Sequence, residues 1–319
     1  MTAKTSLSLL LGALLLGARA RAAETELSIV SDAGAPAGVC ALGATLDRPA
    51  RAKAIVVFAA GSGPQDRDEN IGEAAPLRDL AKALEERGIA TLRYDKRGSK
   101  NDACRASVLN AQVSPENFIA DYANVYDRAA QEGLPVFALG HSEGVTYAIE
   151  AASRGRIAPR GLVLLAGLGR YSLDQTVLRQ LEKGLPGTAD ALRQGLIFFA
   201  RLQAGQAADD EKYLGAYARF WREEIALTAR ASAAAAAVGR PSLLVQGSRD
   251  ANVTREDFDA LSSALAPAAG ESVMLDGLDH FFLKPDETAV DPRVAAAIAV
   301  WIEARLPAPS VAAVEGGTL

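Results

Sequence analysis

Residues 136–144 read Val-Phe-Ala-Leu-Gly-His-Ser-Glu-Gly, and this stretch decides the fold. Its first four residues are a continuous apolar run, which is typical of a strand covered on both faces. The pentapeptide 140–144 follows at once, and residues 145–152 then show the apolar spacing of a helix. A G-x-S-x-G turn between a strand and a helix presents its serine at the edge of a sheet. We therefore expect Ser142 to project from the end of a buried strand.

Short apolar runs alternate with helical patterns on both sides of this stretch. The predicted strands are residues 26–30, 39–46, 54–58, 89–94, 162–166, 242–246 and 272–275, the first two forming an antiparallel pair. The predicted helices are residues 76–87, 114–133 and 291–307, the last two opening with Ser-Pro and Asp-Pro dipeptides. Such alternation predicts an α/β fold, with a doubly wound, mostly parallel sheet and helices on both faces.

One segment departs from this alternation. Residues 171–239 contain helical patterns and an alanine run at 233–237, but no convincing strand. We interpret the segment as a helical cap inserted into a core that comprises residues 23–170 and 240–306. Residues 307–319 are predicted to be a flexible tail.

The first 22 residues have the pattern of a signal peptide. Lys4 provides a positive charge, residues 7–16 are apolar, and residues 20–22 (Ala-Arg-Ala) resemble a signal-peptidase cleavage site. The apolar run is shorter than the about 20 residues that a membrane-spanning helix needs. We therefore expect a periplasmic or secreted protein with no stable membrane span after cleavage.

Composition excludes a nucleic-acid-binding role and leaves the oligomeric state open. The 319 residues carry a formal net charge of -5, and no cluster of Lys and Arg offers a track for phosphates. Cys40 and Cys104 are the only cysteines. Export to an oxidising compartment would allow a disulfide between them, and two unpaired thiols are the alternative.

The scarcity of histidine identifies a candidate base. The chain contains only two histidines, His141 and His280. A serine hydroxyl is a weak nucleophile at neutral pH and needs an imidazole to take its proton. His141 lies next to Ser142 on the same tight turn, so its ring cannot reach back to that hydroxyl. His280 is therefore the predicted base.

The candidate acid is Asp250. The strand predicted at residues 242–246 runs into a turn that ends in this carboxylate. The order serine, acid, histidine along the chain is the one expected for a nucleophile on a strand-turn-helix elbow. We expect Asp250 to orient His280 and to stabilise its protonated form. Asp276 and Asp279, which lie closer to His280 in sequence, are the alternatives.

A glycine-rich turn, residues 60–64, comes directly after the strand predicted at residues 54–58. Attack on a carbonyl produces an oxyanion, which is stabilised by backbone N–H groups aimed at it. The N–H groups of Ser62 in this turn and of Glu143 after the nucleophile are the predicted oxyanion-hole donors. The alternative is a turn without a catalytic role.

Aromatic residues gather in the predicted cap, in a chain that is only 6% aromatic. Tyr213, Tyr217, Phe220 and Trp221 share helical spacing and are the candidate substrate-binding residues. On one helical face they would line an apolar acyl or aryl pocket above Ser142. The alternative is that they form the core of the cap and its contact with the sheet.

Four motifs together resemble the α/β-hydrolase superfamily and, within it, the bacterial esterase and dienelactone-hydrolase-like branch. They are residues 61–68 (Gly-Ser-Gly-Pro-Gln-Asp-Arg-Asp), residues 93–98 (Arg-Tyr-Asp-Lys-Arg-Gly), residues 140–144 and the loops of Asp250 and His280. The resemblance covers residues 40–306 outside the insertion. It implies that the serine, aspartate and histidine named above form a triad. It also implies hydrolysis of carboxylic esters without a cofactor, and a cap over the site.

These observations predict an exported serine carboxylesterase whose substrates are small to medium-sized esters. An exported serine peptidase or amidase of the same fold would use the same three residues, and it is the first alternative. The second is a binding protein that kept the fold without catalysis.

Overall fold

The computed structural model describes residues 23–34, 38–99, 111–183 and 188–307. The predicted signal peptide, Cys104 and residues 308–319 of the predicted tail lie outside these ranges. The disulfide between Cys40 and Cys104 therefore stays a prediction. An intact mass that increases on reduction by the mass of two hydrogen atoms would establish it.

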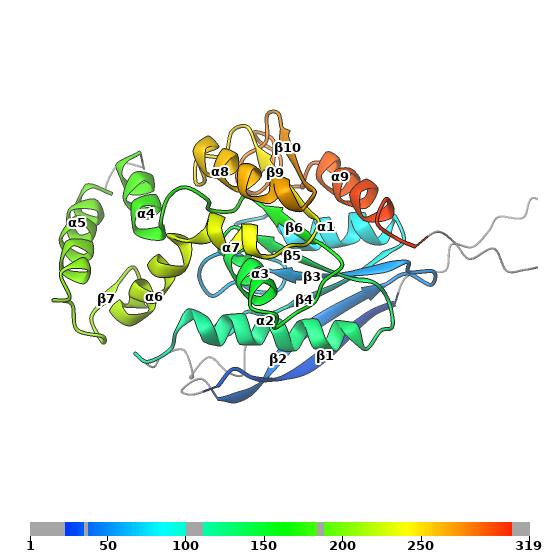
Figure 1. Ribbon diagram of the computed structural model, residues 1–319, viewed down its shortest axis with the longest axis horizontal. Helices are drawn as coiled ribbons and strands as arrows, with labels where there is room; N and C mark the ends of the chain where they lie inside the picture. Colours follow the sequence, from blue (N-terminus) through cyan, green and yellow to red (C-terminus); the bar gives the residue numbers. More distant parts are fainter. Residues whose placement is uncertain (1–22, 35–37, 100–110, 184–187, 308–319) are drawn as a thin grey trace, which may run out of the picture.

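An eight-stranded sheet forms the centre of the molecule (Figure 1). Its strands are β1 (Ala23–Asp32), β2 (Val39–Arg48), β3 (Ala54–Ala59), β4 (Ile89–Tyr94), β5 (Val136–His141), β6 (Leu162–Leu165), β9 (Ser242–Gly247) and β10 (Gly270–Leu275). Their order across the sheet is β1-β2-β4-β3-β5-β6-β9-β10. β2 is antiparallel to β1 and β4, and all other neighbours are parallel. The mostly parallel sheet expected from the sequence is confirmed.

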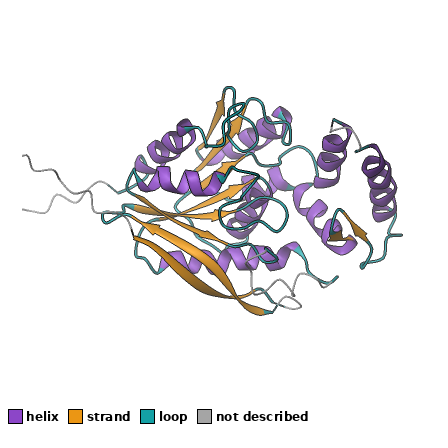
Figure 2. Ribbon diagram, turned by 180° about the vertical axis from the view of Figure 1, so that it is seen from behind, coloured by secondary structure: helices purple, strands orange, loops and turns teal. Residues whose placement is uncertain are grey.

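Helices cover both faces of this sheet (Figure 2). One face carries α1 (Pro76–Glu85) and α9 (Pro292–Glu303), and the other carries α2 (Pro115–Ala130), α3 (Glu143–Ser153), α7 (Ala231–Ala237) and α8 (Arg255–Leu265). β3 contributes to both hydrophobic cores, with Ile55 and Val57 on one face and Val56 and Phe58 on the other. A strand buried on both faces needs an apolar residue at every position, which is why these runs do not alternate. No helix in the described ranges is long and apolar enough to cross a membrane.

Two of the predicted helices begin at side-chain caps. The Ser114 N–H before α2 donates to the side-chain oxygen of Asn117 at 2.9 Å. The Asp291 carboxylate before α9 accepts from the N–H of Arg293, also at 2.9 Å. A proline follows each cap, where its missing N–H loses no helical hydrogen bond. These local signals explain why both starts were predictable.

Only the part of the predicted insertion that precedes α7 forms a lobe at one end of the sheet, since α7 packs with α3 and α8 on the sheet face (Figure 1). The lobe contains α4 (Leu173–Glu182), α5 (Ala189–Gln203), β7 (Lys212–Tyr213), β8 (Ala216–Tyr217) and α6 (Ala218–Thr228). Phe198, Phe199 and Trp221 belong to its own buried cluster. The hairpin of β7 and β8 was not predicted, because strands of two residues show no alternation that a pattern search can find.

The loops that follow β3, β5, β9 and β10 leave the sheet at one edge, since these four strands run in the same direction. They carry Ser62, Ser142, Asp250 and His280. In open α/β sheets, ligands bind outside the carboxyl ends of the strands. The topology therefore gathers the predicted site residues at the edge where a ligand is expected.

Candidate active site

Ser142 occupies a strained turn between β5 and α3. Its backbone angles are φ 54° and ψ -119°, a combination that a residue with a Cβ rarely adopts. The Ser142 N–H donates to the carbonyl of Leu165 at 2.9 Å, and its own carbonyl accepts from Val145 N–H at 3.0 Å. These bonds anchor the turn to the sheet on one side and to the helix on the other. The serine thus lies on the elbow that the sequence predicted.

The two glycines of the pentapeptide leave room for this turn. A Cβ on Gly140 would lie 2.3 Å from the carbonyl oxygen of Gly144. A Cβ on Gly144 would lie 2.2 Å from the carbonyl oxygen of Ala59. Both partners are backbone atoms, which cannot rotate away as a side chain can. The spacing of the motif therefore follows from how closely β3, β5 and α3 approach one another.

We expect Gly144→Ala to lower the free energy of unfolding by about 3 kcal/mol, because its Cβ overpacks rigid backbone. Gly155→Ala is the matched control, since Gly155 has φ +70° and a Cβ added there would meet no atom within 4 Å. That variant should lose only about 1 kcal/mol, from the left-handed conformation alone. Urea denaturation of both variants measures the difference. Equal losses would show that the close approach to Ala59 is not what requires glycine.

The structure brings Asp250 and His280 together. His280 Nδ1 lies 2.9 Å from Asp250 Oδ2, and the two side chains are 7% and 0% exposed. The other oxygen, Oδ1, accepts from the N–H groups of Asn252 at 2.8 Å and Val253 at 2.9 Å. The carboxylate is held by its own turn. It therefore orients the imidazole by accepting a hydrogen bond from Nδ1–H. Nε2 is then the ring atom that can take up a proton.

The two rival carboxylates have other partners. Asp279 Oδ1 accepts from the N–H groups of Phe281 and Leu283, both at 2.9 Å. Asp276 Oδ1 accepts from a serine hydroxyl at 3.0 Å. Asp279 therefore shapes the loop that carries His280 and does not bond its ring.

Ser142 and His280 lie on loops that are joined through His141. His141 Nε2 is 3.0 Å from the His280 carbonyl oxygen, and the centroids of the two rings are 4.9 Å apart. Within the described residues, the Ser142 hydroxyl makes no hydrogen bond to His280. Catalytic hydrogen bonds are often long in ligand-free enzymes and tighten when substrate binds. The direct link from serine to histidine is therefore part of the proposal below.

Glu69 extends this connection to the turn after β3. One carboxylate oxygen accepts from Gly61 N–H at 2.8 Å, and the other lies 2.8 Å from His141 Nδ1. His141 Nε2 must donate to the His280 carbonyl, because a carbonyl oxygen only accepts. Burial opposes a charged ring, but the Glu69 carboxylate, the His280 carbonyl and Asp250 outweigh it and raise the pKa of His141. A buried ion pair thus ties three loops of the site together.

We expect the ion pair of Glu69 and His141 to stabilise the fold most in mildly acidic solution. The pKa of His141 is raised on folding above its ordinary value of 6.5. Its contribution is therefore complete below about pH 6.5 and is lost as the pH rises through the folded pKa. The stability difference between wild type and His141→Gln, measured by urea denaturation, should shrink between about pH 6 and about pH 9. A difference that stays constant over this range would contradict the pairing.

The predicted oxyanion-hole residues lie beside the serine. Ser62, Ser142 and Glu143 all line one cavity. A Cβ on Gly61 would be 3.3 Å from the Cβ of Ser142, so the turn after β3 approaches the elbow closely. In the part of the chain that is described, the N–H groups of Ser62 and Glu143 have no protein acceptor. Glu143 also opens α3, whose N-terminus favours negative charge.

Lys96 connects the two sides of this arrangement. Its ammonium donates to the Gly61 carbonyl at 2.9 Å and to the Glu143 carboxylate. The ring centroids of Phe118 and Tyr147 lie 5.3 and 5.2 Å from Lys96 Nζ. Lys96 is only 4% exposed, and these partners replace the water that its ammonium group loses on burial. Lys96 thereby holds the turn that carries Ser62 and the start of α3 at Glu143 in a fixed relative position.

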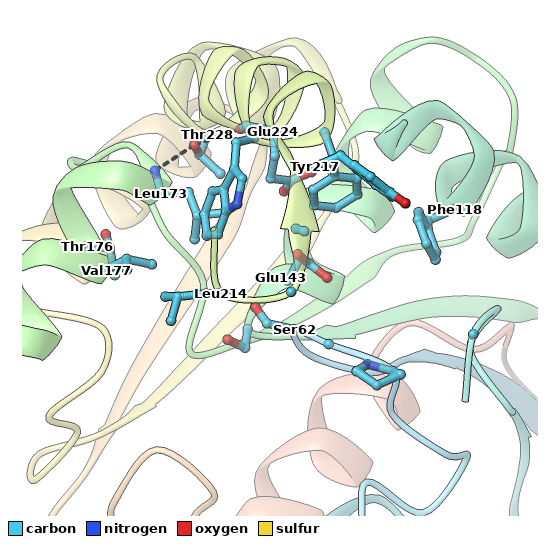
Figure 3. Close-up of a pocket in the computed structure, with 18 of the residues that line it drawn as sticks. Ser62, Phe118, Glu143, Leu173, Thr176, Val177, Leu214, Tyr217, Glu224 and Thr228 are labelled. Carbon is cyan, nitrogen blue, oxygen red and sulfur yellow. Dashed lines mark hydrogen bonds between the residues drawn. The ribbon is translucent and has the colours of Figure 1, made fainter. Parts of the chain in front are cut away.

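A cavity of about 620 Å³ opens at Ser142 between the sheet edge and the helical insertion (Figure 3). Three of the four predicted substrate-binding residues line it, namely Tyr217, Phe220 and Trp221. Tyr213 does not line it. Its ring stacks on Phe198 in the core of the insertion, and its hydroxyl donates to a carbonyl of α5 at 2.8 Å.

Three residues of the site, Glu69, Lys96 and the cavity residue Glu224, were not predicted from the sequence. Glu69 and Lys96 lie in loops, where a buried charge leaves no periodic signal that distinguishes it from surface charges. Glu224 had a signal, because it follows Phe220 by four residues and Trp221 by three on the same helix. That spacing places it on the face already assigned to the pocket.

The chain is similar to a known protein family and to a curated protein. A model of the family described as Hydrolase_4, serine aminopeptidase S33, matches residues 50–287. Esterase EstD of Thermotoga maritima is 28% identical over 261 aligned residues, which cover 77% of this chain and 61% of that protein. The chain thus spans about three fifths of the length of this relative.

Solved structures with low sequence identity share the fold. A carboxyl esterase from Bacillus coagulans superposes with a TM-score of 0.63 at 17% identity, covering 88% of this chain and 98% of the other. The Pyrococcus furiosus esterase gives 0.62 at 12% identity, covering 90% and 92%. Est1E of Butyrivibrio proteoclasticus, solved with ferulic acid bound, gives 0.57 at 18% identity, covering 83% and 96%. At these identities the likeness establishes the fold alone.

Proposed function

Because the chain belongs to the Hydrolase_4 (serine aminopeptidase, S33) family and has the α/β-hydrolase fold, we propose that it is a serine carboxylesterase. Its substrates are small to medium-sized carboxylic esters. The observation that carries this proposal is the strained Ser142 at a large, aromatic-lined cavity, with the Asp250–His280 pair on the adjoining loops. Ser142 is the nucleophile, His280 the general base and acid, and Asp250 the residue that orients it.

In the proposed reaction, His280 Nε2 takes the proton of the Ser142 hydroxyl as its oxygen attacks the ester carbonyl. The N–H groups of Ser62 and Glu143 stabilise the oxyanion of the tetrahedral intermediate. The protonated ring then gives its proton to the leaving alcohol, which departs and leaves an acyl-enzyme. A water molecule then takes the place of the alcohol, gives a proton to His280 and attacks the acyl carbonyl. The bond to Ser142 breaks, the protonated ring returns the proton to the serine oxygen, and the acid is released.

Two similarities support an ester as the substrate. The curated relative is named an esterase, and so are the proteins of Bacillus coagulans and Pyrococcus furiosus that share the fold. The family description favours a second candidate, an aminopeptidase or amidase that uses the same triad. Amide hydrolysis differs in its leaving group, an amine that must be protonated as it departs.

The experiment that tests the proposal compares a series of nitrophenyl acyl esters with peptide nitroanilides on the purified protein. We expect turnover of the esters and labelling of Ser142 by a fluorophosphonate probe. Faster turnover of an anilide than of any ester would favour the aminopeptidase. Failure of both turnover and labelling would favour a binding protein without catalysis.

We further propose that the protein is exported and acts in the periplasm or outside the cell. The support is the signal-peptide pattern of residues 1–22. N-terminal sequencing of the protein recovered after osmotic shock should read from Ala23. Recovery only from the cytoplasm, with the leader intact, would contradict the proposal.

A further inference from the structure

Glu224 is a buried carboxyl in the cavity wall that the proposed reaction does not use. It lies on α6, has no exposed surface and lines the cavity. Figure 3 shows its side chain extending from α6 on the side of the cavity where Glu143 lies. Neither carboxyl oxygen has a hydrogen-bond partner among the described residues. Buried polar groups are normally paired, so this carboxyl has hydrogen-bonding capacity that the protein leaves unused.

The surroundings of Glu224 favour its neutral form. Burial and the charges of Glu143 and Glu150 raise the pKa of Glu224 well above 4.5, although Lys96 acts in the opposite direction. The Lys96 ammonium donates to Glu143 and to the Gly61 carbonyl, and among the described residues neither oxygen of Glu224 accepts a hydrogen bond from it. A protonated carboxyl donates one hydrogen bond and accepts others. A hydroxyl group, which also donates and accepts, is complementary to it.

Charges in the same wall disfavour a charged ligand group at this position. An ammonium group would meet the cation Lys96, whose charge acts on Glu224, and Arg97 and Lys212 line the same cavity. A carboxylate would meet Glu143 in addition to Glu224. A neutral group that forms hydrogen bonds avoids both conflicts.

We propose that Glu224 binds a hydroxyl group on an aromatic part of the ester substrate, an inference that rests on the proposed esterase function. The rings of Phe118, Tyr217, Phe220 and Trp221 line the same cavity and offer surfaces for stacking with an aryl group. The Glu224 carboxyl is covered in the ligand-free structure, so it must rotate toward the cavity to meet the hydroxyl. Since it has no hydrogen-bond partner among the described residues, that rotation breaks no hydrogen bond to them.

The test compares matched ester pairs that differ only in one hydroxyl. On the acyl side, the methyl esters of para-hydroxyphenylpropanoic and phenylpropanoic acid are compared. On the alcohol side, para-hydroxyphenethyl and phenethyl acetate are compared. For one of these pairs we expect the wild-type kcat/KM to be about tenfold higher with the hydroxyl, the effect of one buried neutral hydrogen bond. The pair that shows the effect identifies the side of the ester that Glu224 contacts.

Variants then assign that preference to the carboxyl. Glu224→Leu should reduce the ratio to about one, and Glu224→Gln, which can still donate and accept, should retain most of it. Glu223→Leu and Glu223→Gln are the matched controls, because Glu223 is the neighbour on α6 and pairs with Arg219 at 2.9 Å. The control variants should keep the wild-type ratio. Thermal unfolding of each variant separates a structural effect, which would change the Tm and leave the ratio intact.

Binding to Ser142→Ala separates this inference from the proposed function, because it needs no turnover. Calorimetry should show tighter binding of the hydroxylated ester than of its matched partner, and Glu224→Leu in the same background should remove the difference. If the wild-type kcat/KM is the same with and without the hydroxyl in both ester pairs, while ester turnover is normal, the role of Glu224 is overturned and the esterase function is not. Preference for an aminomethyl analogue over the hydroxylated ester would also overturn it, since Glu224 would then act as an anion. If the wild-type protein turns over no ester, but Ser142→Ala still binds the hydroxylated ester more tightly, the esterase function alone is overturned.

Discussion

Ser142→Ala is expected to lower kcat for nitrophenyl esters by about 10⁴- to 10⁶-fold. Without the hydroxyl no acyl-enzyme can form, and only the oxyanion donors and the binding cavity remain to accelerate attack by water. The free energy of unfolding should change little, because Ser142 makes its anchoring bonds to Leu165 and Val145 through backbone atoms, which alanine retains. Burst kinetics and steady-state assays on the purified variant measure the loss.

Ser153→Ala is the matched control for that experiment. Ser153 ends the same helix, and its hydroxyl donates only to the carbonyl of Glu150, at 3.3 Å, within the described part of the chain. Its removal should leave kcat within about twofold of wild type, as expected for a substitution away from any special feature. Activity of Ser142→Ala within about tenfold of wild type would end the assignment of the nucleophile.

Asp250→Asn is expected to reduce kcat by about 10⁴-fold, as in other triads. The Asp250 carboxylate accepts the Nδ1 proton of His280 at 2.9 Å and thereby leaves Nε2 free to act as a base. An asparagine amide donates where the carboxylate accepted, so it favours the tautomer with the proton on Nε2. That ring cannot take the proton of Ser142, although the fold and the position of the imidazole are preserved.

Asp276→Asn tests the specificity of this effect. Asp276 is the rival carboxylate in the loop after β10, and its side chain accepts from the hydroxyl of Ser248 at 3.0 Å. We expect the Asp276 variant to retain nearly full kcat, while Asp250→Asn loses it at unchanged Tm. Similar losses in both variants would mean that the loop geometry, and not the identity of the acid, limits turnover.

The sheet could be predicted because its strands are encoded locally. β3, β5 and β9 are buried on both faces, and each contains an uninterrupted apolar run, residues 54–59, 136–139 and 243–245. The pairing of Asp250 with His280 could be predicted for a related reason. Parallel strands end at one edge, so residues that follow different strands meet there.

Other parts of the site depend on contacts between loops. Glu69 bonds Gly61 and lies beside His141, whereas Lys96 bonds Gly61 and Glu143. Neither connection has a sequence pattern, since the loops that form it are separated along the chain. Their distances are set by how closely β3, β4 and β5 pack, and the glycines at the elbow are the only trace of this in the sequence.

The sequence alone determined the doubly wound sheet, the serine elbow and the pairing of His280 with Asp250, because strand burial, turn chemistry and chain order can be read from the chain itself. Only the tertiary structure decided which of two similar residues faces the cavity, and this holds for one pair of tyrosines and one pair of glutamates. Tyr217 lines it while Tyr213 packs inside the helical lobe. Glu224 is buried in its wall while Glu223 pairs with Arg219 at the surface of α6. Residue type is the same within each pair, but Tyr213 lies on β7 and Tyr217 on β8, and Glu223 and Glu224 are consecutive on α6, so the hairpin and the orientation of α6 decide which member faces the cavity.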